Sequence, residues 1–516
     1  MLCCNLFGGA NVGQDIEAVA KVLTVFFHHD GFLDVVPSDV VAGILLVRLQ
    51  QRSRKFAAEA AGAAALDLEA GAGAPRREDT DHEAIKISRR RSLLDGSREW
   101  RISSDADIAE MALIYRCSRY ALATYTHLLF LYMRPCTGLC SLVRSRLCAI
   151  GCQGCCCCSP SAGPRRVLGD NACRLNEAAV YSHLGPLRSQ LVYASFRNDV
   201  QNKPFLVFMD REEGAIFVAV RGTLSLEDCL TDALATATPL EKAGQRWGFD
   251  GGGWAHSGFL LGAQAIREEL HQGSVLEEAA GGEGRGDPLR LPLNSSDGGG
   301  AGDVSKFKLV VLGHSLGAGI AVLLTMLLRP AYPHVQCVSF GTPGSVVDYA
   351  TARSCADYVT SVVLHNDMVS RLSFHALVQL RRDVLENIAR AKVGKLAIMK
   401  SALYKRFNVD DFMYRRGDEP DSSFKQNVTA FLETVGRRVA ADTSHSTELF
   451  IPGRLLHFVR QREGGGCGCA GRDKYVPMQA ALGDFSEVEI GSSMALDHFP
   501  DRYFFEMKRV YEEACR

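Results

Sequence analysis

Apolar residues along the chain fall into short runs of strand length and longer runs of helix length. The clearest pair lies near the centre, where residues 309–312 form a short run typical of a buried parallel strand. Residues 316–328 then form a run of helix length that Pro330 stops. We therefore predict a strand, a sharp turn and a helix, with Ser315 at the apex of the turn.

Further runs repeat this alternation of strand and helix. Residues 215–220, 335–340 and 361–364 are predicted as strands, and residues 376–405, 424–440 and 503–515 as helices. Such alternation is typical of an α/β fold with a mainly parallel sheet. The central turn reads Gly-His-Ser-Leu-Gly, a GxSxG pattern that favours the α/β-hydrolase fold.

The GxSxG turn indicates a nucleophilic serine. Gly313 and Gly317 leave room where strand meets helix, so the strained turn lifts the Ser315 hydroxyl into a cleft, next to His314. The N–H of Leu316, at the positive end of the helix dipole, is suited to an oxyanion hole. The alternative is a glycine-rich turn with an incidental serine, but the flanking strand and helix favour the elbow.

A serine nucleophile needs a base and an orienting acid, which follow it along the chain in α/β-hydrolases. Asp367 comes just after the predicted strand 361–364, where ligand-facing loops gather, although a turn or cap role is an alternative. His498 lies in a polar segment before the last helix, whereas His457 lies in the apolar stretch 455–459 and is more typical of a strand histidine. Position favours His498 without excluding His457.

A second loop at the same end of the predicted sheet follows the strand 215–220. Thr223 is suited there to contribute its hydroxyl and N–H to the oxyanion hole, opposite Leu316. Gly-Thr is also ordinary turn chemistry.

Six segments together resemble the class 3 (fungal-type) lipases, and within them the sn-1-specific diacylglycerol lipases, more the beta than the alpha form. They are residues 218–232, 255–259, 313–317, 367–372, 451–457 and 494–500. The resemblance implies that Ser315 is the nucleophile, Asp367 the acid and His498 the base. It implies hydrolysis of diacylglycerol to a 2-monoacylglycerol such as 2-arachidonoylglycerol. Calcium is associated with this family, but the chemistry requires no cofactor, and the chain has no EF-hand loop that would identify a metal site.

Two alternative functions remain open at this point. One is a triacylglycerol, monoacylglycerol or phospholipid hydrolase of the same fold. The other is a catalytically silent, membrane-associated scaffold, which a broken triad would indicate. A net charge of −1 without a large basic domain argues against nucleic acid as a partner. The sequence does not indicate an oligomeric state.

Relatives of this kind carry four N-terminal transmembrane helices. The best apolar candidates here, residues 41–47 and 120–133, are too short to span a bilayer. The start of the chain looks like the point just after the last membrane helix of the family. We therefore expect a membrane-associated protein that works on diacylglycerol at the cytosolic face.

Clustered cysteines offer another means of membrane attachment. Adjacent thiols are poorly spaced for disulfides or zinc, so S-palmitoylation is one interpretation and free cytosolic thiols the other. The candidates are Cys3, Cys4, Cys152, Cys155, Cys156, Cys157 and Cys158.

Composition divides the 516 residues into three parts. We predict an N-terminal helical segment at 1–55, a charged low-complexity linker at 56–101 and the lipase domain at 102–516. Within the domain, 277–305 is too polar and glycine-rich to order itself, and 463–471 is a Gly/Cys-rich loop. Residues 373–449 form a long, largely helical insert, which we interpret as a regulatory lid over the site.

Overall fold

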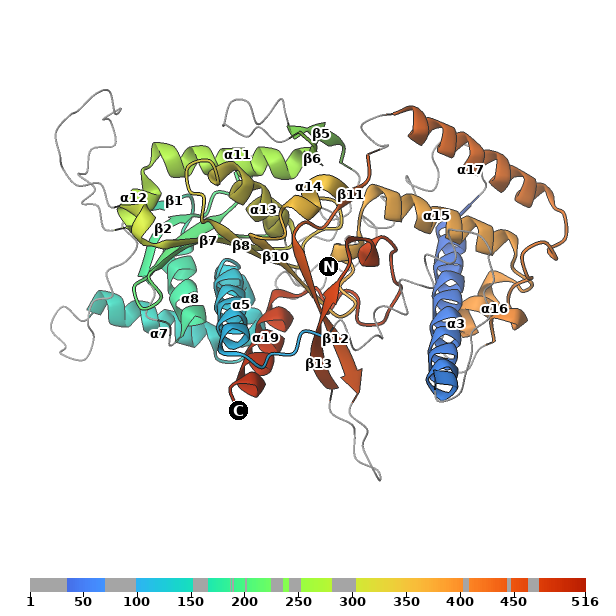
Figure 1. Cartoon of the computed structure of the whole chain (residues 1–516), viewed down its shortest axis with the longest axis horizontal. Coiled ribbons are helices and arrows are strands. Elements are labelled where there is room, and N and C mark those ends of the chain that lie inside the picture. The colour runs from blue at the N-terminus through green and yellow to red at the C-terminus, as the bar shows by residue number, and fades with distance from the viewer. Residues whose placement is uncertain are drawn as a thin grey trace.

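The structure is a computed structural model that describes most of the chain (Figure 1). The described residues are 35–69, 99–151, 166–185, 187, 190–199, 202–223, 235–240, 252–280, 303–401, 408–442, 447–462 and 473–516. The cysteines proposed for palmitoylation and the loop 463–471 lie outside these ranges.

A nine-stranded sheet forms the centre of the molecule, in the order β1-β2-β3-β4-β7-β8-β10-β12-β13. Five of its neighbouring pairs are parallel, and β2–β3, β3–β4 and β12–β13 are antiparallel. This mainly parallel sheet confirms the predicted fold class. The strands are β1 (Arg166–Leu168), β2 (Gln190–Ser195), β3 (Phe205–Asp210), β4 (Ala215–Val220), β7 (Lys308–His314), β8 (Gln336–Phe340), β10 (Val359–Leu364), β12 (Arg454–Arg462) and β13 (Asp473–Ala480).

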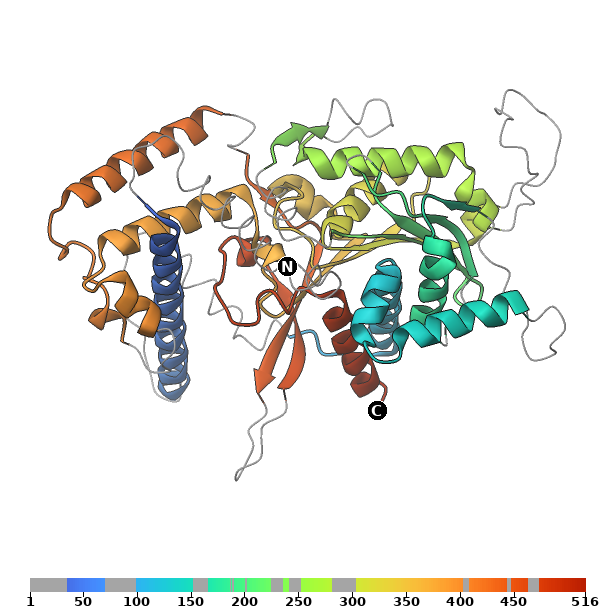
Figure 2. The same ribbon diagram turned by 180° about the vertical axis from the view of Figure 1, so that it is seen from behind.

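Helices cover both faces of this sheet (Figures 1 and 2), which explains why the central strands β3 and β4 are buried at every position. In β4, Ile216 and Val218 join a core with α11 and α13, whereas Phe217 and Ala219 join the opposite core with α5, α8 and α19. The first face carries α11 (Ser257–Gln272), α12 (Val275–Ala279) and α13 (Leu316–Leu328). The second carries α5 (Asp105–Ala123), α8 (Leu175–Leu184) and α19 (Pro500–Ala514).

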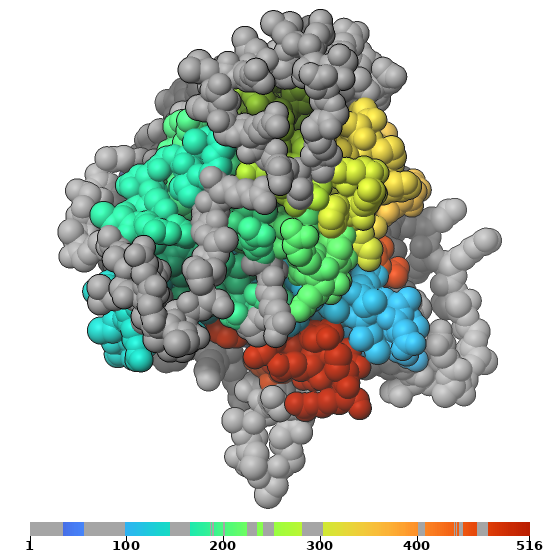
Figure 3. Space-filling view, turned by 90° about the vertical axis from the view of Figure 1, so that its left-hand side faces the viewer, coloured from blue at the N-terminus to red at the C-terminus, as the bar shows by residue number. Residues whose placement is uncertain are grey.

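The two ends of the predicted domain 102–516 meet on that second face. Helix α19 packs along α5, and the two lie side by side at the surface in Figure 3. Helices α6 (Thr126–Met133) and α7 (Gly138–Gly151) continue from α5 and pack on α8. Strand register keeps the carboxyl ends of the parallel strands level, because Val220 pairs with Gly313 and His314 with Phe340. The loops that carry the candidate site residues therefore leave the sheet at one edge.

Smaller elements complete the domain. A second, antiparallel sheet has the order β11-β9-β6-β5. Its strands are β5 (Ala237–Pro239), β6 (Trp254–His256), β9 (Val347–Asp348) and β11 (Leu449–Phe450), with α14 (Tyr349–Ser354) after β9. The 3₁₀ helices are η2 (Ala172–Arg174), η4 (Val304–Lys306), η5 (Val369–Arg371), η6 (Val409–Asp411) and η7 (Leu482–Phe485).

The long insert and the N-terminal segment together form a helical lobe at one end of the molecule (Figures 1 and 2). Helices α15 (Phe374–Ala389) and α16 (Lys395–Ser401) pack against α3 (Pro37–Glu69), and α17 (Ser423–Ala441) packs on α15. Helix α3 continues past residue 56, where the linker was predicted to begin, and residues 70–98 lie outside the described ranges. Helix α12 likewise occupies the start of the predicted disordered insert.

The long helices bear on membrane insertion, which requires about twenty mostly apolar residues in one helix. Within the described ranges, none has both the length and the apolar composition that a membrane crossing requires.

Candidate active site

A strained turn connects β7 to α13. Ser315 lies at its apex with φ 61° and ψ −133°, outside the regions that ordinary side chains favour. A Cβ on Gly313 would lie 2.2 Å from the carbonyl oxygen of Gly317, and one on Gly317 would lie 2.4 Å from that of Val220. Only glycine fits at either position, so the GxSxG spacing is a steric requirement of the elbow.

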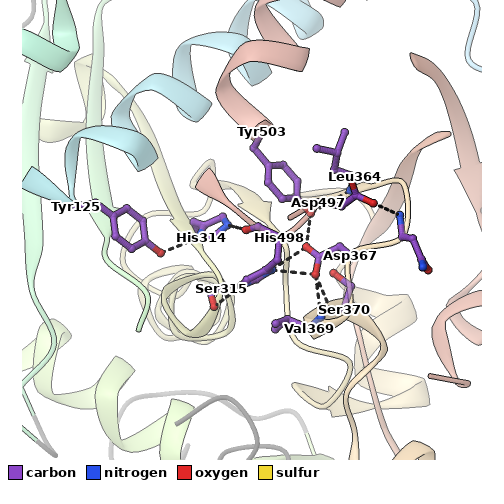
Figure 4. A network of polar contacts seen from close by, with 11 residues as sticks. Tyr125, His314, Ser315, Leu364, Asp367, Val369, Ser370, Asp497, His498 and Tyr503 are labelled. Carbon is purple, nitrogen blue, oxygen red and sulfur yellow. Dashed lines mark hydrogen bonds and ion pairs between the residues drawn. The ribbon is translucent and has the colours of Figure 1, made fainter. Parts of the chain in front are cut away.

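The structure brings Ser315, Asp367 and His498 together from three separate loops (Figure 4). Ser315 follows β7, Asp367 follows β10, and His498 precedes α19. The His498 Nε2 atom lies 2.9 Å from Ser315 Oγ. On the other side of the ring, Nδ1 lies 2.9 Å from both carboxylate oxygens of Asp367. The imidazole therefore bridges the hydroxyl and the carboxylate in the order that the sequence predicted.

The Asp367 carboxylate is fully buried and surrounded by donors. The Val369 N–H donates to Oδ1 at 2.8 Å, and the Tyr503 hydroxyl donates to Oδ2 at 2.6 Å. Burial raises the pKa of a carboxyl group, but His498 and the hydrogen bonds from His498 and Tyr503 outweigh it, so the pKa of Asp367 lies below its usual value. Asp367 is therefore a carboxylate throughout the neutral range.

Tyr503 also connects α19 to the end of β10. Its hydroxyl accepts a hydrogen bond from the Leu364 N–H at 3.0 Å while donating to Asp367. Burial, followed by the charge of Asp367, holds the pKa of Tyr503 well above its usual value. The protonated hydroxyl therefore fixes the carboxylate relative to the sheet.

A second buried chain of contacts reaches His498 through its backbone (Figure 4). The His314 Nε2 atom lies 2.8 Å from the carbonyl oxygen of His498, and Nδ1 lies 2.6 Å from the Tyr125 hydroxyl. Burial, with His498 beside it, lowers the pKa of His314 to about 3, so its ring is neutral. A carbonyl only accepts, so Nε2 carries the proton and Tyr125 donates to Nδ1. The loop that bears His498 is thus held to the elbow.

The predicted oxyanion residues lie beside the serine. Leu316 is the first residue of α13, where backbone N–H groups have no partner within the helix. Thr223 is half-buried and follows Gly222, whose Cβ would lie 2.8 Å from the Ser315 Cβ and 2.3 Å from the His314 oxygen. The loop after β4 therefore passes directly against the elbow, and only glycine allows that approach.

Sequence reasoning missed Tyr125, Tyr503, Gly222 and Gly341 as site residues. Gly341 has φ 55°, and a Cβ there would lie 2.8 Å from an Asp367 oxygen, so its place after a predicted strand was the available signal. The tyrosines left no signal, because they meet the site only through the packing of α5 and α19. His457 lies in β12, where its Nε2 contacts the His365 oxygen at 2.6 Å.

Buried neutral histidines predict acid sensitivity of the fold. Burial lowers the pKa of His314 and His457 to about 3 and of His183 and His365 to about 4, against 6.5 in an unfolded chain. These depressed values mean that only the unfolded state binds protons as the pH falls below 6.5. The stability present above that pH is therefore lost toward pH 3, by up to about 1.4 kcal/mol per pH unit for each histidine.

The test is the free energy of unfolding in urea between pH 7 and 5. His457→Gln keeps a donor for the His365 oxygen and cannot titrate, so we expect its loss of stability between pH 7 and 5 to be about 2 kcal/mol smaller than in the wild type. The exposed His271 provides the control, since His271→Gln should follow the wild-type curve. Identical slopes for His457→Gln and the wild type would contradict the prediction.

The described residues bear on a calcium site, because the resemblance implies calcium. They contain no group of three or more His, Cys, Asp or Glu side chains placed to hold a metal ion.

Comparison with known proteins relates the chain to lipases. Residues 298–376, which contain the elbow and Asp367, match the family model of Lipase (class 3). Diacylglycerol lipase-alpha of Rattus norvegicus is 29% identical over 99% of this chain, and diacylglycerol lipase-beta of Mus musculus is 26% identical over 99%. The chain spans 44% of the length of the alpha protein and 68% of the beta protein.

Solved structures similar to the chain include fungal lipases. The mono- and diacylglycerol lipase from Aspergillus oryzae has a TM-score of 0.32 at 20% identity, over 51% of this chain and 73% of that chain. A fungal lipase with a buried polar cluster has a TM-score of 0.38 at 13% identity, over 78% of this chain and 98% of that chain. The chain is thus similar over almost its whole length to diacylglycerol lipases, and its central residues 298–376 match the class 3 lipase family model.

Proposed function

We propose that the chain is a serine hydrolase that cleaves the sn-1 ester of diacylglycerol, releasing a fatty acid and a 2-monoacylglycerol. The observation that carries the proposal is the imidazole of His498, 2.9 Å from both the Ser315 hydroxyl and the Asp367 carboxylate. The names of the relatives support diacylglycerol as the substrate. The proposed setting is the cytosolic face of a membrane.

The proposed reaction begins with proton transfer within this triad. His498 Nε2 takes the Ser315 proton as Oγ attacks the ester carbonyl, while Asp367 holds the proton on Nδ1 and stabilises the imidazolium. The Leu316 N–H and Thr223 stabilise the oxyanion of the tetrahedral intermediate. His498 then protonates the departing glycerol oxygen. A water activated by the same imidazole releases the fatty acid and restores the Ser315 hydroxyl.

Tyr503 is proposed as a positioning residue for Asp367. Tyr503→Phe removes a 2.6 Å hydrogen bond to a buried carboxylate, so we expect kcat to fall about tenfold, or about 1.4 kcal/mol of barrier. The free energy of unfolding should fall by about 1.5–3 kcal/mol. Because substrate does not contact this hydroxyl, KM should change little. Tyr511→Phe on the same helix is the control, and a KM effect with unchanged kcat would argue against positioning.

Opening of the buried site is proposed to involve movement of the insert 373–449. Ser315 is fully buried, so a diacylglycerol reaches it only after some segment moves. The insert 373–449 starts six residues after Asp367 and leads into α15, which supports its role as the regulatory segment.

Deleting residues 392–421 is expected to raise turnover of soluble esters if this insert restrains opening. The deletion joins Ala391 to Ser422 and removes the segment 392–412, whose flanking residues Ala391 and Met413 form a β-bridge. The measurement is kcat/KM on a short-chain ester, with the melting temperature as the control for folding. Unchanged turnover by a folded deletion variant would show that residues 392–421 do not restrain opening of the site.

The experiment that tests the proposed function is hydrolysis of sn-1-labelled diacylglycerol in detergent micelles, with and without prior fluorophosphonate treatment. Release of the labelled acid that fluorophosphonate blocks would support the proposal. Covalent labelling without diacylglycerol turnover would support a serine hydrolase with another substrate, such as triacylglycerol, monoacylglycerol or phospholipid. A folded protein that takes no label would favour the silent scaffold.

A further inference from the structure

An exposed apolar patch lies on the helical lobe, away from the candidate active site. Leu396, on α16, is 70% exposed, the highest value among the large apolar side chains that the structure describes. Four of the ten exposed side chains of this kind come from α16 and the start of α3. These four, Val36, Val41, Leu396 and Met399, are called the α3–α16 patch. Exposed apolar side chains that gather on neighbouring helices are candidates for an interaction site.

The two segments of the patch are held together by direct contacts. The Asp39 carboxylate accepts hydrogen bonds from Lys395 Nζ at 2.9 Å and from the Val36 N–H at 3.1 Å. Beneath the surface, Ile398 of α16 packs with Ala42 and Leu46 of α3 in one buried cluster. Because Ile398 packs against α3, the opposite face of α16, with Leu396 and Met399, is exposed. Figures 1 and 2 show α16 against α3 at the end of the molecule opposite α7.

The two segments that carry the patch are basic in a chain whose net charge is −1, and the acidic residues Asp410 and Asp411 of η6 lie beside α3. Residues 35–55 and 391–401 together contain seven Lys or Arg residues and a single carboxylate, Asp39. On α16, Lys395 and Lys400 flank the exposed Leu396 and Met399. Apolar side chains between lysines are the pattern of a helix that lies in a membrane interface, with its cations at the lipid headgroups.

We propose that the α3–α16 patch docks the protein on the surface of an anionic lipid bilayer. Leu396 and Met399 enter the acyl region, and the lysines contact the headgroups. The inference rests on the proposed function in one respect, that the substrate is a membrane lipid. Charge complementarity favours the bilayer over a second copy of this chain, because two copies of the patch would bring like charges together.

Vesicle sedimentation of the full chain tests the proposal, with phosphatidylcholine vesicles that contain or lack phosphatidylserine. We expect Leu396→Asp with Met399→Asp to lower the partition coefficient at least about tenfold. Leu261→Asp is the matched control, because Leu261 is 60% exposed on α11, away from the patch. Its partition coefficient should stay within about twofold of the wild type. Lys400→Glu, a milder change at an exposed position, should weaken binding only to phosphatidylserine vesicles.

Equal binding by wild type and the double variant, or an equal loss in Leu261→Asp, would overturn the proposal. The proposal would also be overturned if the wild type did not bind vesicles and instead self-associated through the patch in analytical ultracentrifugation. Melting temperatures verify that each variant is folded. Hydrolysis of a soluble ester by the wild-type preparation reports on the proposed function separately. Vesicle binding without hydrolysis would contradict the proposed function and support the docking surface. Hydrolysis without vesicle binding would support the proposed function and contradict the docking surface.

Discussion

Replacement of Ser315 by alanine is expected to lower kcat for diacylglycerol hydrolysis by about 10⁶-fold, the loss seen when a triad nucleophile is removed. The reason is geometric, because Ser315 Oγ is the atom that His498 Nε2 contacts at 2.9 Å. Alanine keeps the Cβ of serine at φ 61°, so the strain of the elbow is unchanged. The free energy of unfolding should therefore shift by less than about 1 kcal/mol.

Single-turnover assays with labelled diacylglycerol, together with fluorophosphonate labelling, measure this effect. Ser354→Ala is the matched control, since Ser354 is exposed and bonds only locally, to the Thr351 oxygen. It should retain wild-type turnover and labelling. Residual activity above about one part in a thousand in a folded Ser315→Ala protein would indicate a different nucleophile or a contaminating esterase.

The parts of the fold that the sequence predicted are those fixed by local pattern. The ends of β7, the elbow and α13 were predicted to within a residue or two. They follow from the apolar run, the two glycines and Pro330. The order of strands along the chain was enough to bring Asp367 to the same edge as Ser315, because parallel strands share their carboxyl edge. One helix was predicted over 376–405, whereas the structure ends α15 at Ala389 and resumes at Lys395, after Gly394.

The parts that the sequence did not predict depend on contacts between distant segments. Tyr125 meets His314 across 189 residues and Tyr503 meets Asp367 across 136, and neither tyrosine belongs to a local motif. The pairing of α3 with α15 and α16 is similarly remote, so an N-terminal helix and an insert appeared as separate regions. The apolar pattern of an amphipathic helix indicates that one face is buried, but it does not indicate which partner covers that face.

Asp367→Asn is expected to lower kcat by about 10⁴-fold while changing KM little. The amide keeps an oxygen that can accept from the Val369 N–H, which lies 2.8 Å from Oδ1, so the loop should keep its conformation. The amide NH₂ then faces either His498 Nδ1 or the Tyr503 hydroxyl. Facing His498, it donates to Nδ1 and forces the imidazole proton onto Nε2, where the ring cannot accept the Ser315 proton.

Kinetics and fluorophosphonate labelling rates of purified Asp367→Asn measure this loss, with Asp357→Asn as the control. Asp357 lies exposed in the turn before β10, so its amide variant should behave as the wild type. A neutral amide also fails to stabilise the imidazolium, so both acylation and deacylation should slow. If Asp367→Asn kept more than about a tenth of wild-type kcat, the carboxylate would be a structural support for the His498 loop. A loss of similar size in Asp357→Asn would instead point to general destabilisation, which the melting temperatures would reveal.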